Sequence, residues 1–212
     1  MDIQQVYDNI AHDFDRTRFQ VWPIIKQFLN SLPKNCSVAD IGCGNGKNID
    51  LSRKDINYKG MDISSEFVKI CIKKGLDVIQ GNILNIPFEN NQFDNSMSIA
   101  VIHHLSDRMD RIKAISELLR ITKPGGKILI YVWAFDQPEK SKRKFSSYDE
   151  MVPYKTLSGE IYYRYYHLYQ NGELESEIKE IKEYKSEIIE SGYEYGNYYV
   201  IVLLPTDKKP IM

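Results

Sequence analysis

The feature that most constrains the fold of this chain is a glycine-rich turn that follows a short apolar segment. Residues 37–41 read SVADI, which predicts a short buried strand, and residues 40–46 run on as DIGCGNG. Glycines at alternate positions permit a sharp turn and let the backbone approach a ligand closely. We therefore expect a ligand site at the carboxyl end of this strand, facing the N-terminus of a helix from about Asn45 to Arg53.

The segments on either side of this turn alternate between strand-like and helix-like patterns, which predicts an α/β fold with a mostly parallel, doubly wound sheet. The strand-like segments 186–193 and 197–204 flank a turn at 195–197 and predict a C-terminal antiparallel hairpin. The other expected strands are 57–61, 76–80, 93–100, 127–133 and 161–169, and the expected helices are 2–13, 21–31, 64–74, 107–121 and 171–182.

Charge and cysteine content indicate the cellular location of the protein rather than its function. The formal net charge is −1, and basic residues gather only locally, at Arg16 and Arg18 and within residues 140–144. The 3 cysteines form no CxxC pair, so we expect reduced thiols, no metal site, and a cytoplasmic location that can extend to the nucleus. No apolar run approaches the ~20 residues that span a bilayer, and the N-terminal residues lack a signal sequence, so no membrane association is expected.

The glycine spacing favours S-adenosylmethionine over a dinucleotide as the ligand. A dinucleotide-binding turn reads GxGxxG, but Lys47 stands where the third glycine would be. The carboxylate before the turn suits the ammonium and sulfonium groups of S-adenosylmethionine better than phosphates. The acid that ends the second strand follows the middle glycine by 62 − 44 = 18 residues and can accept hydrogen bonds from both ribose hydroxyls. The cofactor residues predicted from this pattern are Asp40, Gly42, Gly44, Gly46 and Asp62.

Residues 81–83 read GNI, residues 86–88 read IPF and residues 93–94 read FD. Together with the glycine turn, these motifs resemble the Rossmann-like S-adenosylmethionine-dependent methyltransferases over residues 37–133. That class usually has Asp where this chain has Asn82. The resemblance implies a Rossmann-like methyltransferase fold with S-adenosylmethionine as its cofactor. It also implies further cofactor contacts from Tyr7, Asn45, Ile63, Asn82, Ile83 and Ala100.

The length of 212 residues suits a single methyltransferase domain. We expect residues 136–160 to form a mobile loop, because they are polar and show no periodicity. The other expected parts are an N-terminal helical lid at 1–33, a cofactor-binding core at 34–135 and a C-terminal substrate-side region at 161–204.

Three segments outside the glycine turn narrow the resemblance: VYDNIAHDF at 6–14, SIAVIHH at 98–104 and YRYYHLY at 163–169. They are similar to segments of the eukaryotic tRNA methyltransferases that act on 5-carboxymethyluridine at the anticodon wobble position and esterify it to 5-methoxycarbonylmethyluridine. The resemblance implies the tRNA anticodon loop as the substrate. It also implies a heterodimer with a small zinc-binding activator protein that several methyltransferases share.

A carboxylate acceptor has an unperturbed pKa of roughly 4, so it needs alignment rather than a general base. Arg164 is a candidate for this task, although it could instead stack on surface aromatics, and Arg18 could instead bind the carboxylate of the cofactor. Of the paired histidines we prefer His103 to His104. Because Tyr166 and His167 alternate along a strand, only one of them can face the ligand. The predicted catalytic residues are His103, Arg164 and Arg18, and the predicted substrate-binding residues are Trp22, which could also be core, Tyr166 and His167.

The third strand, residues 76–80, is expected at an edge of the sheet. It is apolar apart from Asp77, and an unpaired edge of this kind recruits other strands. A strand of the activator could cover it by β-augmentation, unless Lys73 and Lys74 protect it well enough.

Two other functions share the same core. A small-molecule methyltransferase of the quinone-precursor type would keep residues 37–133, but it would have no use for Arg164 among tyrosines. A methyltransferase-like binding subunit without turnover would not need the intact glycine turn and Asp62.

Overall fold

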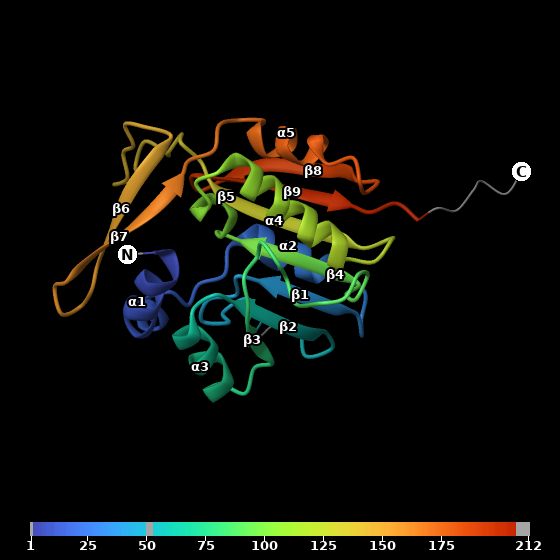
Figure 1. The fold of residues 1–212 in the computed structure, drawn as a ribbon, viewed down its shortest axis with the longest axis horizontal. Coiled ribbons are helices and arrows are strands. Elements are labelled where there is room, and N and C mark those ends of the chain that lie inside the picture. The colour runs from blue at the N-terminus through green and yellow to red at the C-terminus, as the bar shows by residue number, and fades with distance from the viewer. Residues whose placement is uncertain (1, 50–52, 207–212) are drawn as a thin grey trace, which may run out of the picture.

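The computed structural model describes residues 2–49 and 53–206. Its parallel strands are β1 Ser37–Ile41, β2 Asn57–Asp62, β3 Val78–Gln80, β4 Asn95–Ile99 and β5 Lys127–Trp133. The C-terminal hairpin consists of β8 Glu187–Glu194 and β9 Asn197–Leu203. Together they form a seven-stranded sheet in the order β3-β2-β1-β4-β5-β9-β8 (Figure 1). Only β9 pairs antiparallel, with β5 on one side and β8 on the other. The predicted parallel sheet with a C-terminal antiparallel hairpin is confirmed.

The helices are α1 Ile3–Thr17, α2 Pro23–Ser31, α3 Ser65–Lys73, α4 Arg108–Ile121 and α5 Glu173–Glu180, with a 3-10 helix η1 at Ile102–His104. They cover both faces of the sheet, so strand residues that alternate in direction are buried on both sides. Ala39 and Ile41 of β1 pack with α4 and α5 on one face, whereas Val38 packs with α2 on the other. At the edge of the sheet, α3 lies against α1 (Figure 1).

Local signals place most helix starts as predicted. Ser64 caps α3 by accepting a hydrogen bond of 3.2 Å from the backbone amide of Phe67. Asp107 caps α4 in the same way through the amide of Met109 at 2.6 Å. Such caps satisfy backbone donors that a helix leaves unpaired, so they fix where the helix begins. The first helix runs four residues further than expected, to Thr17.

The segment expected as a mobile loop contains a strand. β6, Asp149–Lys155, pairs antiparallel with β7, Ile161–His167, and the two form a separate hairpin that stands beside the main sheet (Figure 1). Pro153 hid this strand in the sequence, because proline cannot donate a ladder hydrogen bond. It is tolerated here since β6 is an edge strand, paired only with β7. The expectation of an unstructured segment over 136–160 is therefore wrong for residues 149–155.

The helix expected from Asn45 to Arg53 is not formed by residues 45–49, which make successive turns, and residues 50–52 lie outside the described residues. The amide of Gly46 donates to the carbonyl of Cys43, and that of Ile49 donates to the carbonyl of Gly46, both at 3.0 Å. These bonds span three residues, and Gly46 has a φ of +75°. A right-handed helix cannot accommodate that backbone angle.

Of the two helices in the expected N-terminal lid, only α1 lies at the carboxyl ends of the parallel strands, whereas α2 packs on a face of the sheet through Phe28 and Leu29. Among the described residues, no helix has both the length and the hydrophobicity that crossing a membrane requires.

Candidate active site

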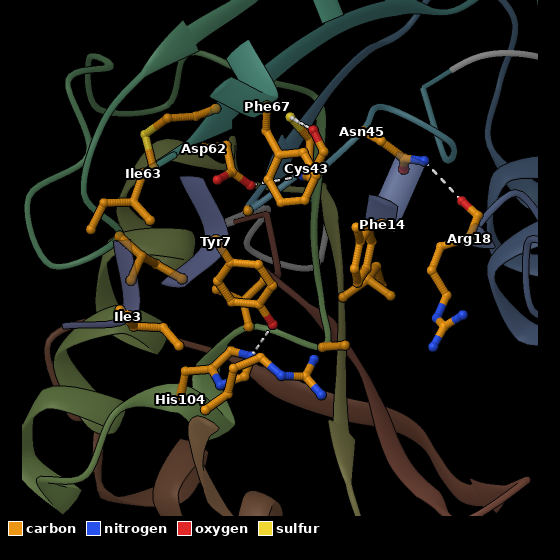
Figure 2. Close-up of a pocket in the computed structure, with 18 of the residues that line it drawn as sticks. Ile3, Tyr7, Phe14, Arg18, Cys43, Asn45, Asp62, Ile63, Phe67 and His104 are labelled. Atoms are coloured by element: carbon orange, nitrogen blue, oxygen red, sulfur yellow. Dashed lines mark hydrogen bonds between the residues drawn. The ribbon is translucent and has the colours of Figure 1, made fainter. Parts of the chain in front are cut away.

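A cavity of about 300 Å³ opens at the carboxyl ends of β1, β2 and β4 (Figure 2). Its walls come from α1, the glycine turn, residues 81–84, the segment after β4, and β7. The predicted site residues on its wall are Tyr7, Arg18, Trp22, Gly42, Gly44, Asn45, Asp62, Ile63, Asn82, Ile83, Ala100, Arg164 and Tyr166. The predicted site residues that do not line it are Asp40, Gly46, His103 and His167.

The glycine turn packs tightly on one side and is open on the other. Gly42 has a φ of +79°, and a Cβ atom there would lie 2.3 Å from a methyl carbon of Val101. A Cβ atom on Gly44 would meet nothing within 4 Å, so the open side of the turn lies at the cavity. Gly46 faces away, because its Cβ would lie 2.4 Å from Leu76. Gly46 is therefore needed for packing and not, as predicted, for contact with a cofactor.

Asp62 holds the glycine turn against the end of β2. Its Oδ2 atom accepts a hydrogen bond of 2.7 Å from the Gly44 amide, and its Oδ1 atom accepts one of 2.9 Å from the Ser64 amide. Burial raises the pKa of Asp62 to about 6. The carboxylate lines the cavity with its remaining lone pairs, so a ligand hydroxyl can reach it (Figure 2).

Asp40 lies wholly buried beneath the cavity rather than on its wall. Neither of its carboxylate oxygens has a hydrogen-bond partner among the described residues. Burial, and after it the neighbouring carboxylate of Asp62, raises the pKa of Asp40 to about 7. Burial of a carboxylate without a hydrogen-bond partner is energetically unfavourable, so this end of the cavity favours a cationic ligand.

Asn82 shapes the wall of the cavity through its side chain. Its side-chain oxygen accepts a hydrogen bond of 2.9 Å from the Leu84 amide, which fixes the turn that carries Ile83. An amide oxygen has two lone pairs, so one remains for a donor on a ligand. Ile63 and Ile83 add apolar surface beside it.

Arg164 supplies a positive charge on the wall of the cavity. It is 7% exposed, and its guanidinium carbon lies 5.3 Å and 5.2 Å from the ring centroids of Tyr154 and Tyr166. Among the described residues, no carboxylate lies within ion-pair distance of it, and its Nε atom has no hydrogen-bond partner. The aromatic stack predicted as an alternative for Arg164 thus exists, but inside the cavity and not on the surface. A buried guanidinium without an acid is suited to an anionic ligand group.

The paired histidines face differently from the prediction. His104 lines the cavity, accepts a hydrogen bond of 2.7 Å from the Tyr7 hydroxyl at Nε2, and donates from Nδ1 to the Tyr165 carbonyl at 2.8 Å (Figure 2). Burial lowers its pKa to about 3, so the ring is neutral. His103 is instead enclosed behind Tyr166 and accepts a hydrogen bond of 3.1 Å from the Trp133 amide. Successive residues of a 3-10 helix point in different directions, and η1 turns His104 to the cavity.

The alternation along β7 brings one of its two candidates to the cavity. Tyr166 lines the cavity, whereas His167 points to the other side. The imidazole of His167 bonds to Glu173 at 2.7 Å and to Asp149 at 3.0 Å, which ties β7 to α5 and β6. The assignment of His167 to substrate binding is corrected to a structural one.

Arg18 and Trp22 lie at the mouth of the cavity. Arg18 is exposed, and its guanidinium lies 5.8 Å and 6.0 Å from the rings of Phe14 and Tyr154. Trp22 is half-buried and lies between Tyr131, 5.1 Å away, and the ammonium of Lys47, 4.0 Å away.

Lys47, Trp133 and Arg143 are among the residues of the cavity wall that were not predicted. Burial lowers the pKa of Lys47 to about 8, and its charge lies near Asp40. The guanidinium of Arg143 lies 4.0 Å above the ring of Trp133, and both residues line the cavity. The run of basic residues at 140–144 was the one available signal for Arg143, but such a run by itself indicates only a solvated surface.

The comparisons with known proteins identify similar methyltransferases. A family model described as "Methyltransferase domain" matches residues 39–130. The tRNA (carboxymethyluridine(34)-5-O)-methyltransferase of Schizosaccharomyces pombe is 38% identical and the alignment covers 94% of each chain. A protein of the same name from Arabidopsis thaliana is 45% identical over 66% of this chain, which corresponds to 34% of that protein.

Solved structures share the fold at low sequence identity. A chain from the complex between the Haloferax volcanii Trm112 methyltransferase activator and a methyltransferase superposes with a TM-score of 0.71 at 15% identity, covering 98% of this chain and 100% of that one. A SAM-dependent methyltransferase from Methanosarcina mazei superposes with a TM-score of 0.66 at 20% identity, covering 88% of this chain and 100% of that one.

Proposed function

The chain belongs to the family of tRNA (carboxymethyluridine(34)-5-O)-methyltransferases, and we propose that it esterifies the carboxymethyl group of uridine 34 in tRNA, with S-adenosylmethionine as the methyl donor. The observation that carries the proposal is Arg164, a buried guanidinium on the cavity wall that has no acid beside it among the described residues. The names of the relatives favour this function over a small-molecule methyltransferase and over a binding subunit without turnover.

The acidic end of the cavity supports the cofactor assignment. Both oxygens of Asp40 are buried and lack partners among the described residues, and the space beside Gly44 is open. S-adenosylmethionine carries positive charge on its ammonium and sulfonium groups, so Asp40 would stabilise it from beneath while Asp62 accepts hydrogen bonds from the ribose. Ile63, Asn82 and Ile83 would hold the adenine. When bound, this cofactor supplies an electrophilic methyl group, which the acceptor oxygen takes as the carbon–sulfur bond breaks, leaving S-adenosylhomocysteine.

The acceptor end needs no general base. A carboxylate with an ordinary pKa of roughly 4 is already ionised at neutral pH, so no proton has to be removed before the methyl group is transferred. His104 is neutral, and its Nε2 atom already accepts the Tyr7 hydroxyl, which is consistent with a site that does not remove a proton. Arg164 would orient the carboxylate, and the rings of Tyr7 and Tyr166 would exclude water from it.

We further propose that a small zinc-binding methyltransferase activator covers β3 in a heterodimer. Among the residues that the structure describes, β3 is the end strand of the sheet and pairs only with β2, so one side of its backbone has no strand partner there. Val78 and Ile79 make it apolar, a combination that favours strand addition. The Haloferax volcanii chain with a similar fold comes from a complex with an activator.

Nucleoside mass spectrometry tests the proposed reaction. The chain, co-expressed with the activator, should convert 5-carboxymethyluridine in tRNA to 5-methoxycarbonylmethyluridine when S-adenosylmethionine is added. The product should revert on mild alkaline hydrolysis, as a methyl ester does. If the protein binds the cofactor but the tRNA carries no methyl ester at position 34, the proposal is contradicted.

A further inference from the structure

A second cavity of about 440 Å³ lies directly beside the first. It is formed by the end of α1, residues 142–145 and the β6–β7 hairpin. The two cavities share part of their walls, so a ligand that fills the first can extend into the second. The shared residues are Arg18, Trp133, Arg143 and Arg164.

Every ionisable side chain on the wall of this second cavity is basic, apart from Tyr154. Its cations come from separate parts of the chain: the residue after α1, the segment 142–144, the end of β6, and β7. They are Arg18, Lys142, Arg143, Lys144, Lys155 and Arg164, and among the described residues no Asp or Glu lines the cavity with them.

These cations also differ from other basic residues of the protein in lacking acid partners. Arg53, Arg111 and Arg120 form ion pairs of 2.7, 2.9 and 2.6 Å with carboxylates. Within residues 2–49 and 53–206, none of the cations of the second cavity lies within 4.0 Å of a carboxylate oxygen. Like charges held together without counter-charges create a strong positive potential, which attracts an anion.

Two of the arginines are held in place before any ligand arrives. Arg164 is 7% exposed, and its guanidinium carbon lies 5.3 Å and 5.2 Å from the ring centroids of Tyr154 and Tyr166. Its Nε atom has no hydrogen-bond partner among the described residues and is free to bind a ligand. Arg143 is fixed 4.0 Å above the ring of Trp133. Fixed guanidinium groups lose little side-chain entropy when they bind an anion.

We propose that this second cavity binds a backbone phosphate of single-stranded RNA next to the nucleotide that occupies the first cavity. The inference rests on the proposed function, since it places the target nucleotide in the first cavity. A carboxymethyl group carries one negative charge and would engage Arg164, which leaves the other cations for the adjoining phosphates. With a net charge of −1 the chain has no general excess of basic residues, so a local cluster must supply the phosphate contacts.

The first test measures how RNA binding depends on salt. K142A/K144A/K155A removes the three lysines on the wall of the second cavity and keeps its arginines. K34A/K54A/K113A is the matched control, because its exposed lysines carry the same charge; two of them precede β1 and β2, at the opposite end of the sheet. Binding of an unmodified anticodon stem-loop is measured over a range of salt concentrations, with cofactor affinity and thermal unfolding as checks on folding.

We expect the cavity variant to bind the stem-loop at least about tenfold more weakly at low salt, and its log–log salt slope to be smaller by about 0.7 for each single-strand phosphate contact that is lost. Cofactor affinity and unfolding temperature should match those of the control. Equal RNA affinity and equal slope in the two variants would overturn the inference. This measurement of RNA binding needs no turnover. If the parent chain fails to esterify uridine 34, that result therefore contradicts the proposed function and not the inference about the second cavity.

The second test identifies the phosphate. A set of stem-loops each carries one uncharged methylphosphonate within two nucleotides of position 34. For at least one position, the methylphosphonate should weaken binding to the parent and to the control variant, but have little further effect on the cavity variant. Additive effects at every position would show that the lysines and these phosphates act independently. Binding of inorganic phosphate that persists alongside such additivity would mark the cavity as an anion site unrelated to RNA, and would equally overturn the inference.

Discussion

Asp40 and Asp62, the two acidic residues at the cofactor end of the cavity, have pKa values raised to about 7 and about 6 because both carboxyl groups are buried. An unfolded chain would titrate them near ~4. Their contribution to the free energy of unfolding is therefore present below about pH 4 and is lost as the pH rises through 6 and 7. A bound cation stabilises the ionised carboxylates, so the binding of a cation is favoured as the pH rises.

The affinity for S-adenosylmethionine should accordingly rise by at least about tenfold between pH 5 and pH 7 and level off above that range. Calorimetry at pH 6 in two buffers of different ionisation enthalpy should detect protons released on binding. Asp40→Asn, which stays neutral, should bind more weakly and with a flatter pH profile. If the affinity of the parent chain is constant over this pH range, the proposal that these two carboxylates stabilise the positive charge of the cofactor is contradicted.

Asp62→Ala should weaken cofactor binding by at least about tenfold, because a charge-assisted contact to the ribose is lost. The substitution also removes the acceptor of the Gly44 amide, so part of the loss will come from a looser glycine turn. Asp62→Asn keeps an acceptor for that amide and should lose less. Calorimetry that finds equal affinities for parent and Asp62→Ala would disprove the ribose assignment.

At the acceptor end, Arg164→Ala should leave cofactor affinity within about twofold and lower turnover on tRNA by roughly 10- to 100-fold, the range expected when a hydrogen bond to a charged group is lost. Arg164→Lys should recover little of this activity, because an ammonium group lacks the planar fork of a guanidinium. Loss of cofactor binding together with activity would instead indicate a structural role for this buried residue.

At the scale of the elements, the position of β7 depends on a buried polar network next to the cavity. Arg111 of α4 pairs with Glu177 of α5 at 2.9 Å, and the Tyr169 hydroxyl donates to Glu177 at 2.9 Å. His167 adds the bonds from β7 to Glu173 and to β6. The network thus joins the hairpin that carries Arg164 to the helices on one face of the sheet.

Glu177→Ala should lower the free energy of unfolding by about 3 kcal/mol, because the buried guanidinium of Arg111 loses its hydrogen-bonded carboxylate and keeps only the longer ion pair of 3.6 Å with Glu173. The double substitution Arg111→Met and Glu177→Leu should cost less than Glu177→Ala alone, since no buried charge remains. Urea denaturation of the three variants measures the difference. A double variant that is less stable than Glu177→Ala would show that the pair contributes more than its desolvation costs.

At the scale of the whole molecule, the unpaired edge at β3 predicts that the isolated chain is poorly soluble or weakly active and that co-expression with the activator restores it. The bonds from the Gly60 amide to the Asp77 carbonyl and from the Gly81 amide to the Asp62 carbonyl show which β3 residues face β2. Strand residues alternate, so the Gln80 amide points to the open side.

Gln80→Pro removes that donor and should weaken the heterodimer by at least about fivefold, the loss of roughly one backbone hydrogen bond, without lowering the unfolding temperature of the chain. Gln80→Ala keeps the amide and serves as the control. Size-exclusion chromatography and calorimetry with the activator compare the two. A monodisperse chain with full activity on its own, or equal binding by the two variants, would contradict a partner at this edge.

Local pattern was sufficient for the parallel sheet, the closing hairpin and the glycine turn, because hydrophobic periodicity and glycine spacing act over a few residues. It also singled out Asp62 and Arg164, which the structure places on the cavity wall, since an acid at the end of β2 and an arginine in an aromatic strand stand out in the sequence itself. Local pattern was misleading where a residue's direction depends on a distant segment. Two examples are the helix expected from Asn45 to Arg53 and the loop expected over residues 136–160, which contains β6.

Tertiary structure decided the rest of the site. His104, not His103, meets the cavity because its Nδ1 atom bonds to the carbonyl of Tyr165, 61 residues further along the chain. Cations from the residue after α1, residues 142–144, β6 and β7 share one cavity only because the hairpin folds back over the end of α1. Such groupings bring together segments that no local pattern connects, so only the packing of the whole chain determines them.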